Sequence, residues 1–181
     1  MFFVNLSNIV QKTKENFLNN TSSKYLFSEE ITIDGEKVPI REVANFQYCD
    51  NNAINICFTT TQGLHSDMWT AKENALSIDD FANQKVVFIS DEAHHLNADT
   101  KKMNKDEEES YRSWEYTVHH IFGANRENVL LEFTATCDIK NPSIKAEYEN
   151  KIIFDYPLYK FRADRYSKEI DSLRSDLDVE D

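Results

Sequence analysis

The chain has 181 residues, 40% of them hydrophobic and 12% aromatic, which is enough for one packed domain. Its net charge is −12, but the acidic run 106–109 carries −4 of it and the tail 169–181, with six acids and one arginine, carries −5. The other residues are close to neutral. A basic coat over the whole surface is therefore excluded, whereas a local nucleic-acid groove is not.

Several classes of protein are excluded by simple counts. Cys49, Cys57 and Cys137 are too few and too far apart for a disulfide framework or a paired-cysteine zinc site, so we expect a cytoplasmic protein. No apolar run reaches the ~18 residues of a membrane-spanning helix, and the N-terminal segment lacks the basic and apolar regions of a signal peptide. We expect no membrane partner.

Four short apolar runs recur along the chain, each followed by a polar cluster and then, for the most part, by a helical pattern. They are rich in β-branched and aromatic residues and do not alternate, which predicts strands buried on both faces of a parallel sheet. These predicted strands are Phe2–Val4, Ile54–Phe58, Val86–Ser90 and Val129–Phe133.

The segments between these strands carry mostly helical signals. Ile9, Val10, Thr13 and Phe17 form one apolar stripe, and Ser110 can cap a second helix that ends at Gly123. Between the first two strands, 30–40 predicts a small inserted β-hairpin with Asp34-Gly35 as its turn.

The later part of the chain is more polar. Residues 97–109 predict a solvated loop, 142–150 a helix and Ile152–Phe154 a final strand. We expect one domain over 1–165 and a frayed acidic tail over 166–181. Alternating strands and helices predict an α/β fold, with right-handed crossovers placing helices on both faces of the sheet.

In such sheets ligands bind beyond the carboxyl ends of the strands, which is where the polar clusters fall. Val86–Ser90 leads directly into Asp91 and Glu92. The first carboxylate can hold Mg²⁺, and the second can orient the water that attacks a terminal phosphate. The simpler alternative is that both side chains only end the strand and cap the next helix.

The segment Asp91-Glu92-Ala93-His94 resembles the DEAH box of superfamily 2 DEAD/DEAH-box helicases, and Thr134-Ala135-Thr136 resembles their motif III. Together with Phe58-Thr59-Thr60-Thr61-Gln62 and Ser113-Trp114-Glu115, the ordered set is similar to the helicase domain of type III restriction enzyme R subunits. The resemblance extends from residue 2 to about residue 165.

This resemblance implies a partial RecA-like, P-loop NTPase-like lobe of a DNA-tracking motor that uses ATP and Mg²⁺. Asp91 would bind Mg²⁺, Glu92 would position the hydrolytic water and His94 would relay the nucleotide state. Thr134 and Thr136 would couple hydrolysis to movement. The residues implied to contact DNA phosphates are Thr60, Thr61 and Gln62, although threonines at strand ends also serve as ordinary caps.

One motif of the family is missing from the sequence. A phosphate-cradling loop needs G-x-x-x-x-G-K-[ST], and the three glycines, Gly35, Gly63 and Gly123, fit no such pattern. We expect the chain to be a fragment that begins after this loop and stops before the second lobe and the nuclease. We therefore expect that the chain alone does not hydrolyse ATP. The partners implied are DNA, the remainder of the R subunit and a methyltransferase subunit.

Two other functions remain open at this point. The chain could be a non-enzymatic DNA- or partner-binding module, or half of a split motor that another chain completes. The second is a metal-dependent hydrolase, in which the pairs His94-His95 and His119-His120 would join Asp91, Glu92 and His65.

Overall fold

The structure is a computed structural model, and it describes residues 1–28, 30–70, 72–93, 105–135, 137 and 140–167. The chain divides into two compact units, Met1–Cys137 and Asp138–Asp181, which are described separately below.

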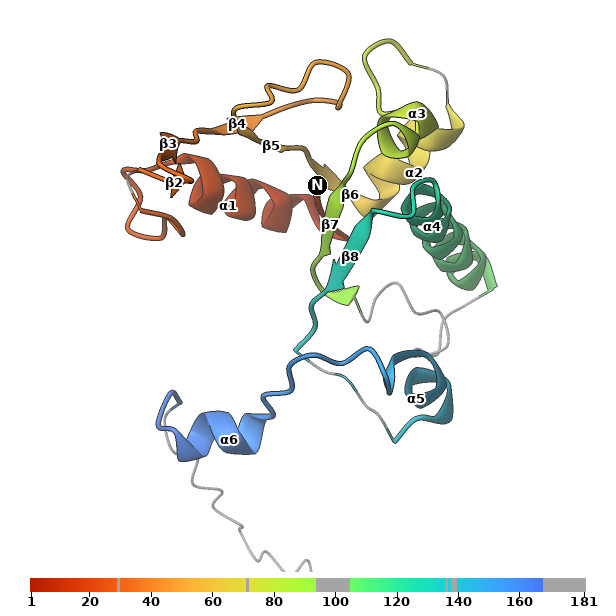
Figure 1. The fold of residues 1–181 in the computed structure, drawn as a ribbon. Helices are drawn as coiled ribbons and strands as arrows, with labels where there is room; N and C mark the ends of the chain where they lie inside the picture. Colours follow the sequence, from red (N-terminus) through yellow and green to blue (C-terminus); the bar gives the residue numbers. More distant parts are fainter. Residues whose placement is uncertain (29, 71, 94–104, 136, 138–139, 168–181) are drawn as a thin grey trace, which may run out of the picture. The chain divides into compact units, whose positions relative to one another are not determined.

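The first unit is built on a four-stranded parallel sheet with the strand order β6-β1-β7-β8 (Figure 1). Its strands are β1 (Phe2–Val4), β6 (Phe58–Thr60), β7 (Val87–Ser90) and β8 (Val129–Glu132). The expected α/β class, with a parallel sheet flanked by helices as in a partial RecA-like fold, is confirmed.

Helices lie on both faces of the sheet (Figure 1). On one face Phe17 of α1 (Ser7–Leu18) packs against Phe58, their ring centroids 5.9 Å apart, and Phe58 in turn neighbours Phe2. Because successive side chains of a strand point to opposite faces, Phe3 belongs to the other face. There it joins the core formed with α2 (Thr61–Trp69), α3 (Ile78–Ala82) and α4 (Lys105–Gly123). The buried members of this core are Met1, Phe3, Phe46, Cys57, Leu64, Leu76, Phe81, Val86, Phe88, Val118 and Ile121.

Helix α4 begins earlier than the sequence pattern indicated. The acidic run 106–109 lies in its first turns and not in a solvated loop, so that part of the loop prediction is wrong. Acidic residues are favourable in the first turns of a helix because the N-terminus is the positive end of the helix dipole. The rest of the predicted loop, 97–104, lies outside the described residues. Although α4 has 19 residues, the described part of the chain contains no helix that is long and apolar enough to cross a membrane.

The inserted hairpin between the first two predicted strands is confirmed. Strand β2 (Thr32–Ile33) pairs antiparallel with β3 (Glu36–Lys37). The turn residues Asp34 and Gly35 have φ angles of 52° and 85°, and a turn with both central residues in this region suits an Asp-Gly pair. The return strand is shorter than expected, however, since Ile40 belongs to a separate strand.

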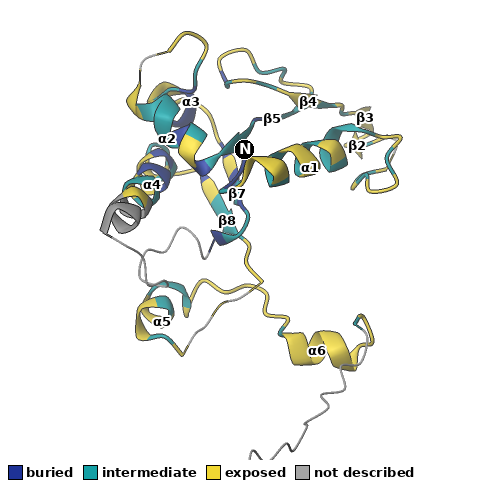
Figure 2. Cartoon of the chain, turned by 180° about the vertical axis from the view of Figure 1, so that it is seen from behind, coloured by how far each residue is buried: buried dark blue, intermediate teal, exposed yellow. Residues whose placement is uncertain are grey.

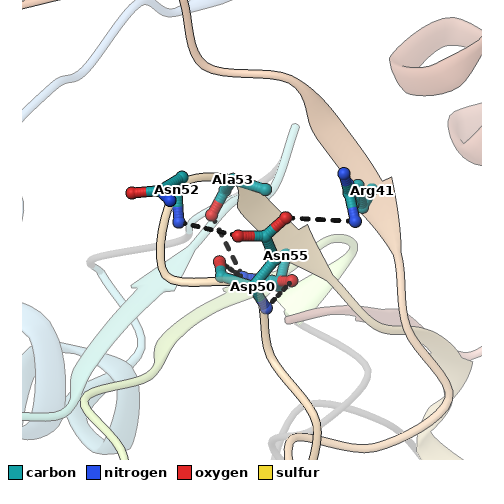
Figure 3. Close-up of polar contacts among 5 residues, drawn as sticks. All are labelled: Arg41, Asp50, Asn52, Ala53 and Asn55. Atoms are coloured by element: carbon teal, nitrogen blue, oxygen red, sulfur yellow. Dashed lines mark hydrogen bonds and ion pairs between the residues drawn. The ribbon is translucent and has the colours of Figure 1, made fainter. Parts of the chain in front are cut away.

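That separate strand, β4 (Ile40–Glu42), pairs in parallel with β5 (Ile54–Ile56) outside the main sheet. The connection between them is closed by polar contacts (Figure 3). The Asn55 side chain donates to the carbonyl oxygens of Asp50 and Ala53, at 2.8 and 3.0 Å, and the Asp50 carboxylate pairs with Arg41 at 3.0 Å.

The predicted strand Ile54–Phe58 is divided in the structure. Its first half, β5, pairs with β4, and its second half joins β6 beside β1, with Cys57 between the two. A continuous apolar run does not reveal such a change of partner, because both halves are partly buried. Cys57 itself is 3% exposed.

Burial makes Cys57 a chemically inert thiol. Desolvation of the thiolate raises the pKa of Cys57 to about 11, whereas Cys137 is exposed and Cys49 is half-buried. Because the thiolate is the reactive form, we expect Cys137 to react with an aromatic disulfide reagent at pH 8 within the mixing time and Cys57 only after unfolding. A Cys49→Ser/Cys137→Ser variant isolates Cys57. Rapid labelling of this variant in buffer without denaturant would contradict the buried position.

The second unit contains α5 (Pro142–Tyr148) and α6 (Leu158–Ala163). The prediction of a helix at 142–150 is confirmed for α5, where Pro142 occupies the first turn and the Asn141 side chain accepts from the Ser143 amide. The predicted strand Ile152–Phe154 is wrong: this segment is not paired in a sheet, and Ile153 is 90% exposed. Helix α6, which the sequence analysis did not predict, is also largely exposed (Figure 2). Of the acidic tail, residues 168–181 lie outside the described part.

Candidate functional site

The four parallel strands bring their carboxyl ends to the same edge of the sheet. Val4 of β1 is in register with Thr60 of β6, and Phe3 of β1 is in register with Ser90 of β7. Ser90 is in turn aligned with Glu132 of β8. The polar residues that follow these strands therefore meet at one rim, as expected from the parallel arrangement.

At this rim the acidic pair and Thr134 are neighbours. The Phe133 amide donates to the Ser90 carbonyl at 2.8 Å, and the Ala93 amide donates to the Phe133 carbonyl at 2.9 Å. These two bonds clamp Asp91 and Glu92 beside the segment that leads into Thr134. The acidic pair and Thr134 therefore lie on neighbouring segments at the rim. His94 and Thr136 lie outside the described residues.

The backbone turns sharply at the acidic pair. Glu92 has a φ of 54°, which is uncommon for a residue with a side chain, and its amide donates to Asp91 Oδ1 at 2.9 Å. Both carboxylate side chains are half-buried, and Ala93 next to them is 4% exposed. Residues held in this backbone region tend to occur at functional sites, where surrounding contacts maintain the conformation.

The residues at the end of β7 suit a hard divalent cation. Two carboxylates supply the oxygen ligands that Mg²⁺ prefers, commonly together with water and phosphate oxygens. Directly before them, the Ser90 hydroxyl oxygen is buried and has no hydrogen-bond partner among the described residues. An orphaned buried hydroxyl in the residue that directly precedes two carboxylates is compatible with a bound ion or water near the end of β7.

A metallohydrolase built on histidine clusters gains no support from the described residues. Within them, no group of three His, Cys, Asp or Glu side chains lies close enough to hold a metal ion. His119 lies 4.0 Å from Glu115 on the same helix, whereas His65 contacts Thr117 at 2.7 Å and His120 stacks on Trp69. His94 and His95 lie outside the described part.

The three residues that the resemblance associates with DNA contact, Thr60, Thr61 and Gln62, have different surroundings. Thr60 is the N-cap of α2, and its hydroxyl accepts from the Gly63 amide at 2.9 Å. A β-carbon at Gly63 would lie only 2.8 Å from the Thr59 hydroxyl, so glycine permits this close packing. Thr61 is 3% exposed and its side chain faces the interior, whereas Gln62 is exposed.

Gln62 also lines a groove of about 600 Å³ between α2 and α4 that the sequence analysis did not identify. The other lining residues are His65, Ser66, Trp69, Thr70, Ser110, Ser113 and Trp114. On α2 the signal was available in the spacing of Gln62, Ser66 and Trp69, which places them on one helical face. Because that face is polar and aromatic, it is not detected when a sequence is searched for apolar helix faces.

Comparison with known proteins gives a consistent result. Residues 1–139 match the family described as "Type III restriction enzyme, res subunit". The chain is 37% identical over 195 aligned positions to a protein of Haemophilus influenzae named "Probable type III restriction-modification enzyme HindVIP Res subunit". That alignment covers 98% of this chain but 38% of the relative, so the chain spans well under half of the relative's length. No solved structure matches the chain.

Proposed function

The chain belongs to the Res-subunit family of type III restriction enzymes, and from this premise we propose that it forms the DEAH-box part of a RecA-like lobe in an ATP-dependent DNA translocase. The observation that carries the proposal is the position of Asp91 and Glu92 beside Thr134, at the carboxyl rim of a parallel sheet. This is the place where an α/β sheet presents groups to a bound nucleotide.

Each residue of the rim then has a distinct task. Asp91 holds Mg²⁺, which when bound supplies positive charge next to the phosphate oxygens. Glu92 orients the attacking water and accepts its proton. Thr134, on the segment after the neighbouring strand, transmits the change at the nucleotide, and Thr136 and His94, which lie outside the described residues, take part in the same relay. Thr60 and Gln62 contact the DNA backbone, and Thr61 supports them from within the core.

A nucleotide site also needs a phosphate cradle, which the sequence does not contain. The sheet offers a place for one. Among the described strands β8 pairs with β7 alone, so it forms an edge of the sheet beside which a further strand can be added. On the face that α1 shares, Val87 is 47% exposed and Val129 is 44% exposed, although both lie in register on neighbouring parallel strands.

The handedness of crossovers indicates what would cover this face. The connection from β7 to β8 places α4 on the Phe88 face. A further strand beside β8 would be connected to β1 by a segment that crosses the sheet in the direction opposite to the β7–β8 connection. A right-handed crossover would therefore place the helix of this connection on the opposite face, which is the α1 face. A strand, phosphate loop and helix would thus cover Val87 and Val129 while bringing the loop to the rim that holds Asp91 and Glu92. Such a unit could be supplied in the same polypeptide or by a second one, as in a split motor.

Reconstitution tests this function. We expect the 181-residue chain alone to show no DNA-stimulated ATP hydrolysis above background. Joining it to a strand–loop–helix segment from a family member that carries the G-x-x-x-x-G-K-[ST] loop should produce Mg²⁺-dependent hydrolysis. In the joined protein, Glu92→Gln should lower the rate by about a hundredfold, because the general base is lost while the side chain keeps its size. Release of phosphate measures the rate.

The matched control is Glu36→Gln, which removes the same charge from the exposed hairpin and should leave the rate unchanged. Hydrolysis by the chain alone that Glu92→Gln abolishes would show that no added cradle is needed. If the joined protein is folded and binds ATP but remains inactive, the non-enzymatic DNA- or partner-binding module becomes the better description.

The family also suggests the cellular setting. Type III restriction enzymes combine a Res subunit with a modification subunit and act on DNA, so we infer that DNA, the remainder of the Res subunit and the modification subunit are the partners of this chain, in the cytoplasm. The recognition sequence would be read by the modification subunit, because the residues placed on the rim here are suited to phosphate contact, which carries no base sequence.

A further inference from the structure

The groove between α2 and α4 has flat aromatic side chains at its surface. Trp69, at the end of α2, lines the groove and is 53% exposed. It stacks with Tyr116 of α4, which is 59% exposed, at a centroid distance of 6.1 Å and an angle of 27°. His120, one turn further along α4, stacks on both rings. Large exposed rings in a cluster are unusual on a surface without a binding role.

A hydrogen bond to a buried residue also fixes the position of the Trp69 indole. Its Nε1–H donates to the Thr117 hydroxyl oxygen at 2.9 Å, and the His65 ring nitrogen Nδ1 lies 2.7 Å from the same oxygen. Thr117 is 1% exposed and donates to the Ser113 carbonyl at 3.0 Å. A ring fixed by a buried hydrogen-bond network loses little conformational entropy when it binds, which is typical of a preorganised contact.

The lining of the groove indicates the chemistry of its occupant. A groove for an amphipathic helix presents aliphatic side chains, whereas the residues that line this one are two tryptophans together with hydroxyl, amide and imidazole groups. Its volume of about 600 Å³ suits a ligand of nucleotide size. Indole rings with hydrogen-bonding neighbours match an unpaired nucleic-acid base, which offers a flat face and a polar edge.

The position of the groove points to the same ligand. Gln62 belongs both to the groove and to the first turn of α2, whose cap Thr60 ends a strand at the functional rim. We propose that the α2–α4 groove binds an unpaired base of a single DNA strand by stacking on Trp69, next to the place where the same strand's backbone passes the N-terminus of α2. This inference rests on the proposed DNA-translocating function. The residues at the rim are proposed to contact only the DNA backbone, and the groove would add a contact to a base.

The chain contains two tryptophans, and both line the groove, so its intrinsic tryptophan fluorescence reports on this site alone. The probe is a short oligodeoxythymidylate, compared with an abasic oligonucleotide of the same length and phosphate charge. We expect the thymidylate to quench the fluorescence and the abasic strand to leave it unchanged. Fluorescence anisotropy of the two oligonucleotides, each labelled with a dye, measures total binding independently of the tryptophans.

Variants of the chain test the role of the ring. Trp69→Leu should weaken thymidylate binding by about tenfold or more, since stacking on a base is lost, and Trp69→Phe should retain most of the affinity. Ser66→Leu fills the groove without altering the ring and should also weaken binding, so the test does not depend on the folding of one variant. Tyr48→Leu is the control because Tyr48 is an 89% exposed aromatic side chain that does not line the groove.

The outcomes separate this inference from the proposed function. Equal binding of both strands by anisotropy, with no quenching and no effect of Trp69→Leu, would overturn the base site and leave the DNA contact at the rim intact. Absence of any binding, even at low salt, would count against both. Quenching by the modification subunit but not by thymidylate would make the groove a protein-docking site and would also overturn the inference.

Discussion

Phe88→Ala is expected to lower the free energy of unfolding by about 3–5 kcal/mol, which is a large part of the stability of a typical domain. Phe88 lies in β7, one of the two inner strands of the sheet, and is 0% exposed. Its ring stacks on Phe81 of α3 at a centroid distance of 5.5 Å, within the core that α2, α3 and α4 form on this face. Removing the ring leaves a cavity that a parallel sheet between fixed helices cannot close.

The matched control for Phe88→Ala is the neighbouring substitution Val87→Ala. Val87 is on the same strand, but its side chain points to the other face and is 47% exposed. We expect it to cost about 0.5 kcal/mol or less, as usual for a substitution at a partly exposed position. Urea unfolding followed by circular dichroism measures both. Similar costs for the two variants would mean that the faces of β7 are not arranged as described.

Asn128→Asp is expected to destabilise the chain by about 3–5 kcal/mol at neutral pH, because it places an unpaired charge in the interior. Asn128 is 6% exposed, and its amide nitrogen donates to the carbonyl oxygens of Phe81, Ile121 and Phe122 at 3.1–3.3 Å. Its side-chain oxygen accepts from the Val86 amide at 2.9 Å. One side chain thus joins α3, the end of α4 and the start of β7. A carboxylate would retain the bond from Val86 and repel the three carbonyl oxygens.

The pH dependence of this variant distinguishes charge from shape. Burial raises the pKa of the introduced carboxyl above its unfolded value, so its destabilisation should be greatest at neutral pH and should shrink as the pH falls through the raised pKa. Asn125→Asp is the control, since Asn125 makes similar bonds to Ala82 and Gln84 but is partly solvated, and we expect a smaller cost. A loss that does not change between pH 7 and pH 4, measured against the unsubstituted protein, would contradict the charge explanation.

Local chemistry explains the predictions that the structure confirms. Short β-branched runs without alternation favour a parallel sheet with helices on both faces, and the end of each run marks its carboxyl edge. Asp34-Gly35 specifies a tight turn because both residues tolerate positive φ, and Pro142 suits the first turn of a helix. In these places the signal lies within a few consecutive residues, and tertiary contacts do not override it.

The wrong predictions share a different physical cause. Ile152–Phe154 has strand-like composition, yet strand formation needs a partner, and the second unit offers none in its described residues. The acidic run 106–109 was predicted to be a loop because of its charge, but it forms the first turns of α4, where the positive end of the helix dipole makes acidic residues favourable. Cys57 lies inside an apolar run that changes sheets, and composition alone carries no information on which strand pairs with which.

The amino-acid sequence was sufficient to identify Asp91, Glu92 and Thr134 as strand-end residues, because the apolar runs before them and the polar residues after them are contiguous. Their proximity depended on strand order, which places β8 directly beside β7. The groove at Trp69 could not be identified in this way, because it lies between two helices that are far apart in the sequence. Trp69 of α2 donates to Thr117 of α4, which is 48 residues away along the chain. Only the packing of α2 against α4 joins them, and the pairing of two helices is set by the complementarity of their surfaces and not by either segment alone.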